Sequence, residues 1–324
     1  MCKKRLIFAL SMLFLFFLWS TSYTAVVIAL KDFSPSGLAL FRFLIASAIL
    51  FALSFIYKVR LPDKKDLLLI SVCGVLGISV YNIIMFSGQK AIPVALSSLL
   101  LNTYPIFVSI FSLLIFKEFI NTFKWIGIIV CFVGIIIASG GNFTFNNSVI
   151  LILTAAIILS LFDLEQRVLM KKYRPFELTC YFVWAGTLAL CIFLPALIKD
   201  LATVKSNSLI TAVYLGAFPS VAASVLWAKL IFKYSVSSLA CYCYISPIFT
   251  AIVAFLFLNQ MPGQSVITGA IVVISGLFII HFSKSINLNF IKNMLNLKSD
   301  GLYTVPCRVQ LLIHRFPRLF HREK

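Results

Sequence analysis

Apolar residues follow one another along this chain in long blocks, which short polar or charged segments separate. A helix of about 20 apolar residues is long enough to cross the hydrocarbon core of a bilayer. Since lipid offers backbone groups no hydrogen-bond partner, and these blocks are too uniformly apolar for barrel strands, each block predicts a helix. We therefore predict an all-α polytopic membrane protein with ten transmembrane helices, in residues 6–30, 35–56, 67–86, 93–116, 125–138, 149–169, 176–198, 209–232, 236–258 and 266–281.

The composition supports this prediction, because 61% of the residues are hydrophobic, 12% are charged and the mean hydropathy is +1.04. These values exclude an ordinary soluble domain. The first block follows three basic residues, as in a secretory signal, but it is too long for the apolar core of one. We expect it to remain as the first helix.

The sequence repeats itself without a gap at a spacing of 142 residues. The tripeptide Pro-Ile-Phe at Pro105 recurs at Pro247, and Gly127 and Gly134 also have glycines at this spacing. Similar composition is another explanation for resemblance between apolar helices, but a shared register of prolines and glycines favours duplication. We predict two five-helix repeats, residues 6–138 and 149–282. An odd number of helices makes the second repeat inverted, an architecture typical of alternating-access transporters.

The positive charges give the orientation. The chain has a net charge of +18, and fourteen Lys and Arg fall at one end of the predicted helices against four at the other, before the eight in the tail. Because cytoplasmic loops are enriched in Lys and Arg, we expect both termini in the cytoplasm of a bacterium, with the chain in its inner membrane. Nucleic acid is not needed to explain the charge. The tail, residues 283–324, is basic and amphipathic and is expected to lie on the anionic inner leaflet; a binding arm is the alternative.

No cofactor, metal or catalytic motif is apparent. The eight cysteines form no Cys-x-x-Cys pair, and there is no phosphate-binding loop for ATP hydrolysis. The three histidines stand at or beyond the end of the last apolar block. We expect no enzyme activity, and the oligomeric state is open.

The prolines within the fourth and ninth helices indicate a site. Pro105 and Pro247 each remove a helical hydrogen bond, and backbone groups freed in this way are tolerated only in protein or beside a water-filled cavity. Ser98, Asn102 and Tyr244 share helix faces with them and are candidate substrate-binding residues. The alternative is that small residues here allow close helix packing.

Ionisable residues inside the membrane are a second signal. Charges are costly there, so Arg42, Asp163, Glu165 and Lys229 are candidates for substrate or proton handling. Structural pairing is the alternative, with Asp163 bound to Arg167 one helical turn away, and with Glu165 and Lys229 extending toward the cytoplasmic surface. Aromatic and polar residues at mid-helix add four candidate binding residues: Trp19, Ser20, Tyr81 and Asn82.

The chain resembles the ten-helix, EamA-type members of the drug/metabolite transporter superfamily. The resemblance is carried by FLWSTSYTAVVIAL at 17–30, ALFRFLIASAIL at 39–50, AIPVALSSLLLNTYPIFVSIFSLLIFKEF at 91–119 and WIGIIVCFVGIIIA at 125–138. It implies two tandem five-helix units and a central cavity lined by the first, third, fourth, sixth, eighth and ninth helices.

We therefore predict a secondary transporter for a small organic metabolite, such as an amino acid or a derivative like S-adenosylmethionine. The solute class follows from the resemblance and from the aromatic and polar candidates. Alternatives are an exporter of drugs or toxic metabolites and, less favoured, a channel or a structural membrane protein.

Overall fold

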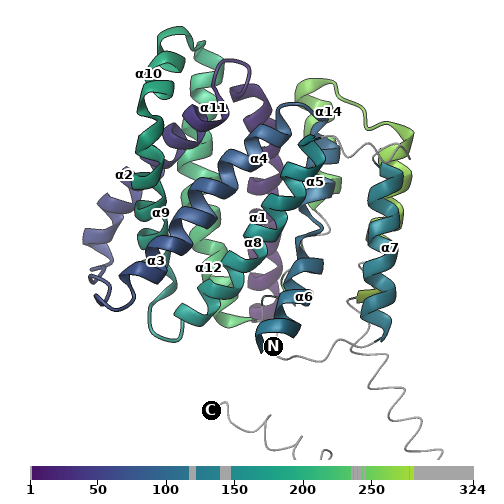
Figure 1. Ribbon diagram of the computed structural model, residues 1–324, viewed down its shortest axis with the longest axis horizontal. Coiled ribbons are helices and arrows are strands. Elements are labelled where there is room, and N and C mark those ends of the chain that lie inside the picture. Colours follow the sequence, from purple (N-terminus) through teal and green to yellow (C-terminus); the bar gives the residue numbers. More distant parts are fainter. Residues whose placement is uncertain are drawn as a thin grey trace, which may run out of the picture. The chain divides into compact units, whose positions relative to one another are not determined.

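The computed structural model describes residues 2–116, 122–138, 147–234, 236, 239, 243, 246–276 and 278–280. The predicted tail, residues 283–324, and the candidate Tyr244 lie outside them. Within the described residues all regular structure is helical. The labelled helices (Figure 1) are α1 (Cys2–Ala29), α2 (Pro35–Ile56), α3 (Leu67–Gly74), η1 (Val75–Val80), α4 (Tyr81–Gln89), α5 (Val94–Leu101), α6 (Tyr104–Phe116), α7 (Thr122–Ala138), α8 (Asn147–Leu169), α9 (Pro175–Leu190), η2 (Cys191–Phe193), α10 (Leu194–Thr203), α11 (Ser206–Ala217), η3 (Phe218–Ala223), α12 (Ser224–Lys233) and α14 (Ser246–Leu258). A further helix, Gln264–Ile280, is called the last helix below.

The apolar blocks of the sequence correspond to these helices. Seven described segments are long and apolar enough to cross a bilayer, and the segments Trp125–Ala138, Ser246–Leu258 and Gln264–Ile280 are shorter and apolar. The all-α prediction is confirmed. The seventh predicted helix ends too early, because η2 and α10 continue it to Thr203. The ninth predicted helix is described as a helix only from Ser246 onward.

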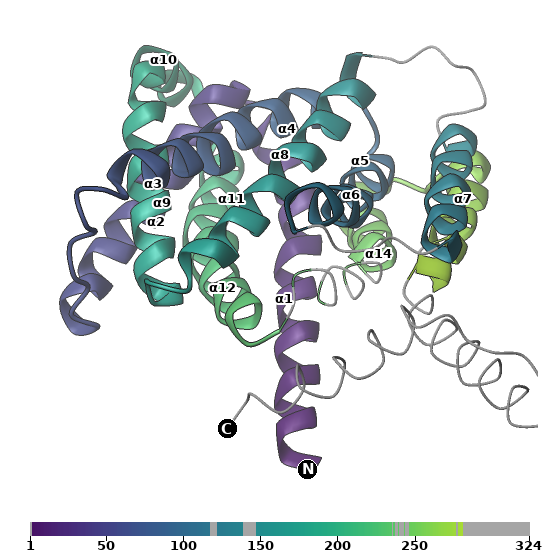
Figure 2. The same ribbon diagram turned by 60° about the horizontal axis from the view of Figure 1, so that its bottom comes forward.

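α7 and the last helix lie side by side in Figures 1 and 2 and pack through glycines. A Cβ on Gly127 would lie 2.6 Å from the Gly276 carbonyl oxygen, and a Cβ on Gly276 would lie 2.7 Å from that of Gly127. Gly134 and Gly269 meet in the same reciprocal way, at 2.9 and 2.6 Å. This pairing makes the two helices antiparallel.

The register of the contact matches the repeat. Gly269 is the counterpart of Gly127 at the spacing of 142, and Gly276 is the counterpart of Gly134. Gly127 thus touches the counterpart of Gly134, and Gly134 touches the counterpart of Gly127. Two copies related by a twofold axis make contacts of this kind. Between them Cys131 Sγ donates to the carbonyl oxygen of Val273, its own counterpart, at 3.5 Å. These contacts are those expected of inverted repeats.

Two π-helical segments interrupt the third and eighth membrane helices. η1 separates α3 from α4, and η3 separates α11 from α12. Their positions differ by about the repeat spacing, so each half carries one in the equivalent helix. Short π segments inside α-helices are frequent at functional sites. Pro219 explains the second, because it removes a backbone donor from that turn. We have no comparable account of the first.

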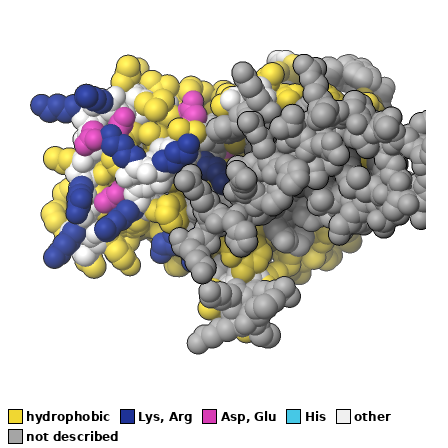
Figure 3. Space-filling view, turned by 90° about the horizontal axis from the view of Figure 1, so that it is seen from below, with side chains coloured by type: hydrophobic (Ala, Val, Ile, Leu, Met, Phe, Trp, Pro, Cys, Tyr) yellow, Lys and Arg dark blue, Asp and Glu magenta, His cyan; other side chains and the backbone are white. Residues whose placement is uncertain are grey.

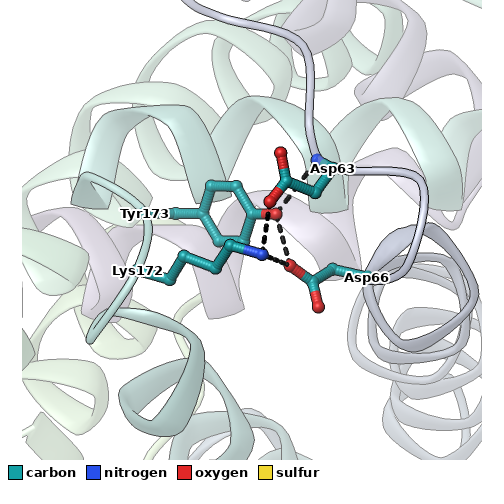
Figure 4. A network of polar contacts seen from close by, with 4 residues as sticks. All are labelled: Asp63, Asp66, Lys172 and Tyr173. Carbon is teal, nitrogen blue, oxygen red and sulfur yellow. Dashed lines mark hydrogen bonds and ion pairs between the residues drawn. The ribbon is translucent and has the colours of Figure 1, made fainter.

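Polar contacts fasten the loop before α3 to the loop before α9 (Figure 4). Lys172 Nζ lies 2.5 Å from carboxylate oxygens of both Asp63 and Asp66. The Tyr173 hydroxyl donates to Asp66 Oδ2 at 2.5 Å and accepts from the Asp63 backbone N–H at 3.1 Å. The Lys172 ammonium, and then the Tyr173 hydroxyl, hold the pKa of Asp66 below its ordinary value. We call these four residues the loop clasp.

The loop clasp lies at the end of the bundle where Lys and Arg gather. Figure 3 shows the molecule from below, with dark blue Lys and Arg side chains around a few magenta acids. In the two loops of the clasp and beside them, Lys58, Lys64, Lys171 and Arg174 are exposed. The opposite end has its own polar contacts: Asp200 Oδ2 accepts from the Ser34 backbone N–H at 2.9 Å. Polar contacts between the two halves of the chain thus tie the bundle at both ends.

We expect Gly127→Ala to destabilise the protein by about 1–3 kcal/mol, because a methyl group there overlaps the Gly276 backbone. The measurement is the melting temperature in detergent, with size-exclusion chromatography for monodispersity. Gly263→Ala is the matched control, since the nearest atom to its added Cβ is 4.0 Å away. Equal melting temperatures for the two variants would contradict the glycine interface.

The loop clasp makes stability sensitive to acid. The lowered pKa of Asp66 means that its contribution is complete above the ordinary aspartate pKa of about 4 and is lost as the pH falls through the folded value. We expect the melting temperature of the wild type to fall between pH 5 and pH 3 by more than that of Asp66→Asn. Parallel curves for the two proteins would show that Asp66 does not carry this effect.

Candidate functional site

A cavity of about 180 Å³ lies among helices of both halves of the chain. Its walls come from α1, α2, η1, α4, α5 and α6 in the first half and from α8, α9, η3, α12 and α14 in the second. Aromatic side chains form much of the wall, including Trp19, Phe43, Tyr81, Phe86 and Trp227. Charged and amide groups interrupt this surface at a few places.

Arg42 is one of the two charged side chains among the described residues that line the cavity. It comes from α2 and reaches η3, where Nε donates to Ser220 Oγ, and α4, where Nη1 donates to Asn82 Oδ1 at 3.4 Å. Its guanidinium also stacks over the rings of Phe43 and Phe86, at 5.3 and 5.8 Å from their centres. A guanidinium has five N–H donors, so donors remain for an anionic group in the cavity.

The π segment η3 places the partner of Arg42. Pro219 has no N–H for the carbonyl of Leu215, four residues before it, and the Ser220 hydroxyl donates to that carbonyl at 2.8 Å. The same hydroxyl oxygen accepts from Arg42. A backbone group freed by a proline is thereby satisfied, and the satisfying side chain orients the cation.

Asp163, on α8, is the second charged side chain. It is 1% exposed, and Trp227 Nε1 donates to its two carboxylate oxygens at 3.1 and 3.2 Å. The Trp19 ring meets Trp227 edge to face, with ring centres 5.1 Å apart. The carboxylate therefore sits beside a pair of tryptophans in the cavity wall.

Arg42 and Asp163 line the same cavity without an ion pair. The ion pairs among the described residues are those of Lys172 in the loop clasp, so neither charge is neutralised by a protein side chain of opposite sign in this part of the chain. Tyr81 lines the same cavity. Buried charges are costly unless they are paired, so this arrangement leaves a positive and a negative group for a ligand to neutralise.

A helix break in the first half of the chain reaches the cavity. α5 ends at Leu101 and α6 begins at Tyr104, so Pro105 stands in the first turn of a new helix rather than in the middle of a kinked one. Asn102 Nδ2 donates to the Ser98 carbonyl oxygen at 2.7 Å, and Thr103 Oγ1 donates to that of Leu100 at 2.7 Å. Both carbonyls also accept from backbone N–H groups, those of Asn102 and Thr103, so the two side chains add second hydrogen bonds to the last turn of α5.

In the second half of the chain α14 begins at Ser246, with Pro247 next to it. The Tyr104 hydroxyl, next to Pro105, lies 3.7 Å from the Sγ atom of Cys243, four residues before Pro247. Tyr104 and Cys243 both line the cavity, as do Asn102 and Ser246.

Both halves of the chain match one family model, that of the EamA-like transporter family, over residues 6–140 and 146–282. The chain belongs to the EamA-like transporter family. It is a membrane transporter and not an enzyme, as the sequence predicted.

Relatives of similar length are also transporters. "Uncharacterized transporter YdfC" of Bacillus subtilis is 29% identical over 87% of this chain and 98% of its own length. A "Probable terminal-alkyne amino-acid exporter" of Streptantibioticus cattleyicolor is 29% identical over 81% of this chain and 89% of its own. A solved crystal structure with 19% identity has a TM-score of 0.64 over 83% of this chain and 94% of that one, so the two share a fold.

Six residues singled out from the sequence of this EamA-like protein line the cavity: Trp19, Arg42, Tyr81, Asn82, Asn102 and Asp163. Ser20 and Ser98 are buried beside it and donate to the carbonyl oxygens of Ser246 and Ala95 at 3.2 Å each. Glu165 accepts from Cys73 Sγ at 2.8 Å, and Lys229 is exposed on the outer surface of α12.

Two expectations need correction. Asp163 does not pair with Arg167, because Arg167 Nη1 donates to the Tyr234 carbonyl oxygen at 3.0 Å while Asp163 accepts from Trp227. The cavity also draws on more helices than the resemblance implied, since the second and seventh supply Arg42 and Thr179. α9 approaches α3 and η1 closely because Gly74 and Gly186 lie at their contact, and α2 approaches α11 closely because Gly216 lies at theirs.

Sequence reasoning left Gln166 out of the candidates, although it lines the cavity one turn beyond Asp163. A glutamine in an apolar helix with a carboxylate three residues earlier was the available signal. Among the described residues no group of three or more His, Cys, Asp or Glu could hold a metal ion.

Asn102 and Thr103 separate two roles at the first helix break, because both donate to the end of α5 but only Asn102 lines the cavity. We expect Asn102→Ala and Thr103→Val each to lower stability by about 1 kcal/mol, the contribution of one hydrogen bond. Only Asn102→Ala should also reduce solute flux into proteoliposomes. Equal flux in the two variants would assign Asn102 a capping role alone.

Proposed function

We propose that this protein is a secondary transporter for a zwitterionic metabolite of amino-acid type, which it moves across a bacterial inner membrane by alternating access. The observation that carries the proposal is the presence of Arg42 and Asp163 in one cavity without an ion pair between them. The planar guanidinium of Arg42 can bind a carboxylate through two parallel hydrogen bonds. The Asp163 carboxylate, beside Trp227 and Trp19, can bind an ammonium group.

The size of the cavity favours a small solute. Pockets for drug-sized molecules commonly measure about 300–1,000 Å³, whereas this one is about 180 Å³. Export of drugs or toxic metabolites, the second candidate, has the aromatic wall in its favour, but Arg42 repels the organic cations that such a wall attracts. S-adenosylmethionine, which adds a cationic sulfonium to an amino acid, is the largest solute we would test.

The relatives point the same way. The Streptantibioticus cattleyicolor relative is named for amino-acid export, and a relative from Escherichia coli that matches 44% of this chain at 30% identity is named an inner membrane transporter. The inverted repeats support alternating access, in which two similar halves exchange conformations around a central site. The cationic face with the loop clasp would lie in the cytoplasm.

The first experiment is a thermal-shift screen of the purified protein against amino acids, nucleosides, sugar phosphates, S-adenosylmethionine and cationic dyes. Counterflow of each radiolabelled hit in proteoliposomes then tests transport. We expect amino acids or their derivatives to be the hits. Stabilisation by dyes alone would favour the drug-export alternative.

Variants that remove one charge each test whether Arg42 binds the carboxylate of the solute and Asp163 its ammonium group. We expect Arg42→Gln to weaken binding of an amino acid at least tenfold but to leave binding of its carboxamide nearly unchanged, because the carboxamide has no carboxylate. Asp163→Asn should weaken the amino acid similarly and leave its 2-oxo acid analogue nearly unchanged.

Lys229→Gln is the matched control, because this side chain is an intramembrane charge that lies outside the cavity. We expect its affinities to equal those of the wild type. If both cavity variants weakened the binding of the amino acid, its carboxamide and its 2-oxo acid analogue by the same factor, the two charges would be structural. The proposal that Arg42 binds the carboxylate and Asp163 the ammonium group would then be wrong.

A further inference from the structure

Gln166, a residue of the cavity wall, carries a buried amide oxygen without a hydrogen-bond partner in the described part of the chain. The side chain is 4% exposed and lines the cavity, and its Oε1 atom has no hydrogen-bond partner among the described residues. A buried amide oxygen without a donor costs about 1–3 kcal/mol. Such a cost persists in a folded protein when another molecule supplies the donor, or when the group has a role that outweighs it.

Its neighbours define the missing donor. Gln166 follows Asp163 by one helical turn, so the two side chains lie on one face of α8, and both line the cavity. Trp227 supplies a single N–H to the Asp163 carboxylate, whose two oxygens have further acceptor sites. This corner of the cavity therefore has several free acceptor positions and one negative charge.

A primary ammonium group fits this corner. An ammonium group carries one positive charge and three N–H donors. A single carboxylate oxygen does not accept all three, so further acceptors are needed. Resting on the proposed function, we propose that Gln166 is a specificity-determining residue: Asp163 neutralises the ammonium group of the solute, and Gln166 Oε1 accepts one of its N–H bonds. Gln166 thereby distinguishes primary ammonium groups from fully N-methylated ones, which have the charge but no N–H.

Gln166 and Asp163 differ in the chemical groups that they recognise. The Asp163 carboxylate attracts any cation, methylated or not. A neutral amide oxygen stabilises only a group that donates a hydrogen bond to it. The aromatic pair Trp19 and Trp227 would accept methylated and unmethylated ammonium alike. Discrimination by methylation therefore falls on Gln166 more than on the other groups of this corner.

The test compares Gln166→Met with the wild type. Methionine keeps the length of the side chain and removes the acceptor. The probes are the twenty protein L-amino acids, and the tightest binder is then compared with its N,N,N-trimethyl derivative. We expect the wild type to prefer the primary amine and Gln166→Met to reduce that preference about tenfold, the effect of one hydrogen bond to a charged group.

Stability provides the second readout. Because the substitution removes a buried oxygen without a partner, the melting temperature of Gln166→Met without ligand should equal or exceed that of the wild type. Thr250→Val is the matched control: Thr250 Oγ1 is also buried without a partner, but the residue does not line the cavity. Its melting temperature should behave similarly, while its preference for the primary amine should not change.

The outcomes separate the two proposals. If amino acids bind the wild type but the preference is the same in Gln166→Met, the role of Gln166 is overturned and the proposed function stands. If Gln166→Met lowers the melting temperature and weakens both probes equally, the side chain is structural. If no amino acid binds the wild type, the proposed function fails and this inference fails with it.

Discussion

A bilayer offers no hydrogen-bond partner to the backbone, and this constraint governs the interior of the protein. At the interruptions before α12 and after α5, side chains donate to backbone carbonyls. Ser220 donates to the Leu215 carbonyl that Pro219 leaves free, and Asn102 and Thr103 donate to the end of α5. Interruptions that would be costly in lipid are thus confined to the place where protein and cavity surround them.

One of these interruptions also positions a charge, that of Arg42. Ser220 links the η3 segment to Arg42, and Asn102 brings an amide to the cavity wall where α5 ends. Asp163 comes from an uninterrupted helix and is held by Trp227 from α12. A cation from the first half of the chain and an anion from the second line one cavity, and no ion pair joins them.

Much of this could be predicted from the sequence. Apolar length gave the helices, because crossing a bilayer requires a minimum number of residues, and the shared register of Pro105 and Pro247 gave the duplication. Arg42 and Asp163 stood out since charges are rare in such helices. The pairing of Asp163 with Trp227 depends on contacts between distant helices, which local spacing does not encode. The π segments and the unpartnered amide oxygen of Gln166 could not be predicted for the same reason.

The central claim is that the unpaired Arg42 and Asp163 hold the two ends of a zwitterion. An experimental structure with the amino acid that binds best in the screen tests it most directly. We expect the ligand in the cavity with its carboxylate within hydrogen-bond distance of the Arg42 guanidinium and its ammonium group on Asp163. A ligand bound elsewhere, or one in the cavity that touches neither charge, would contradict the claim.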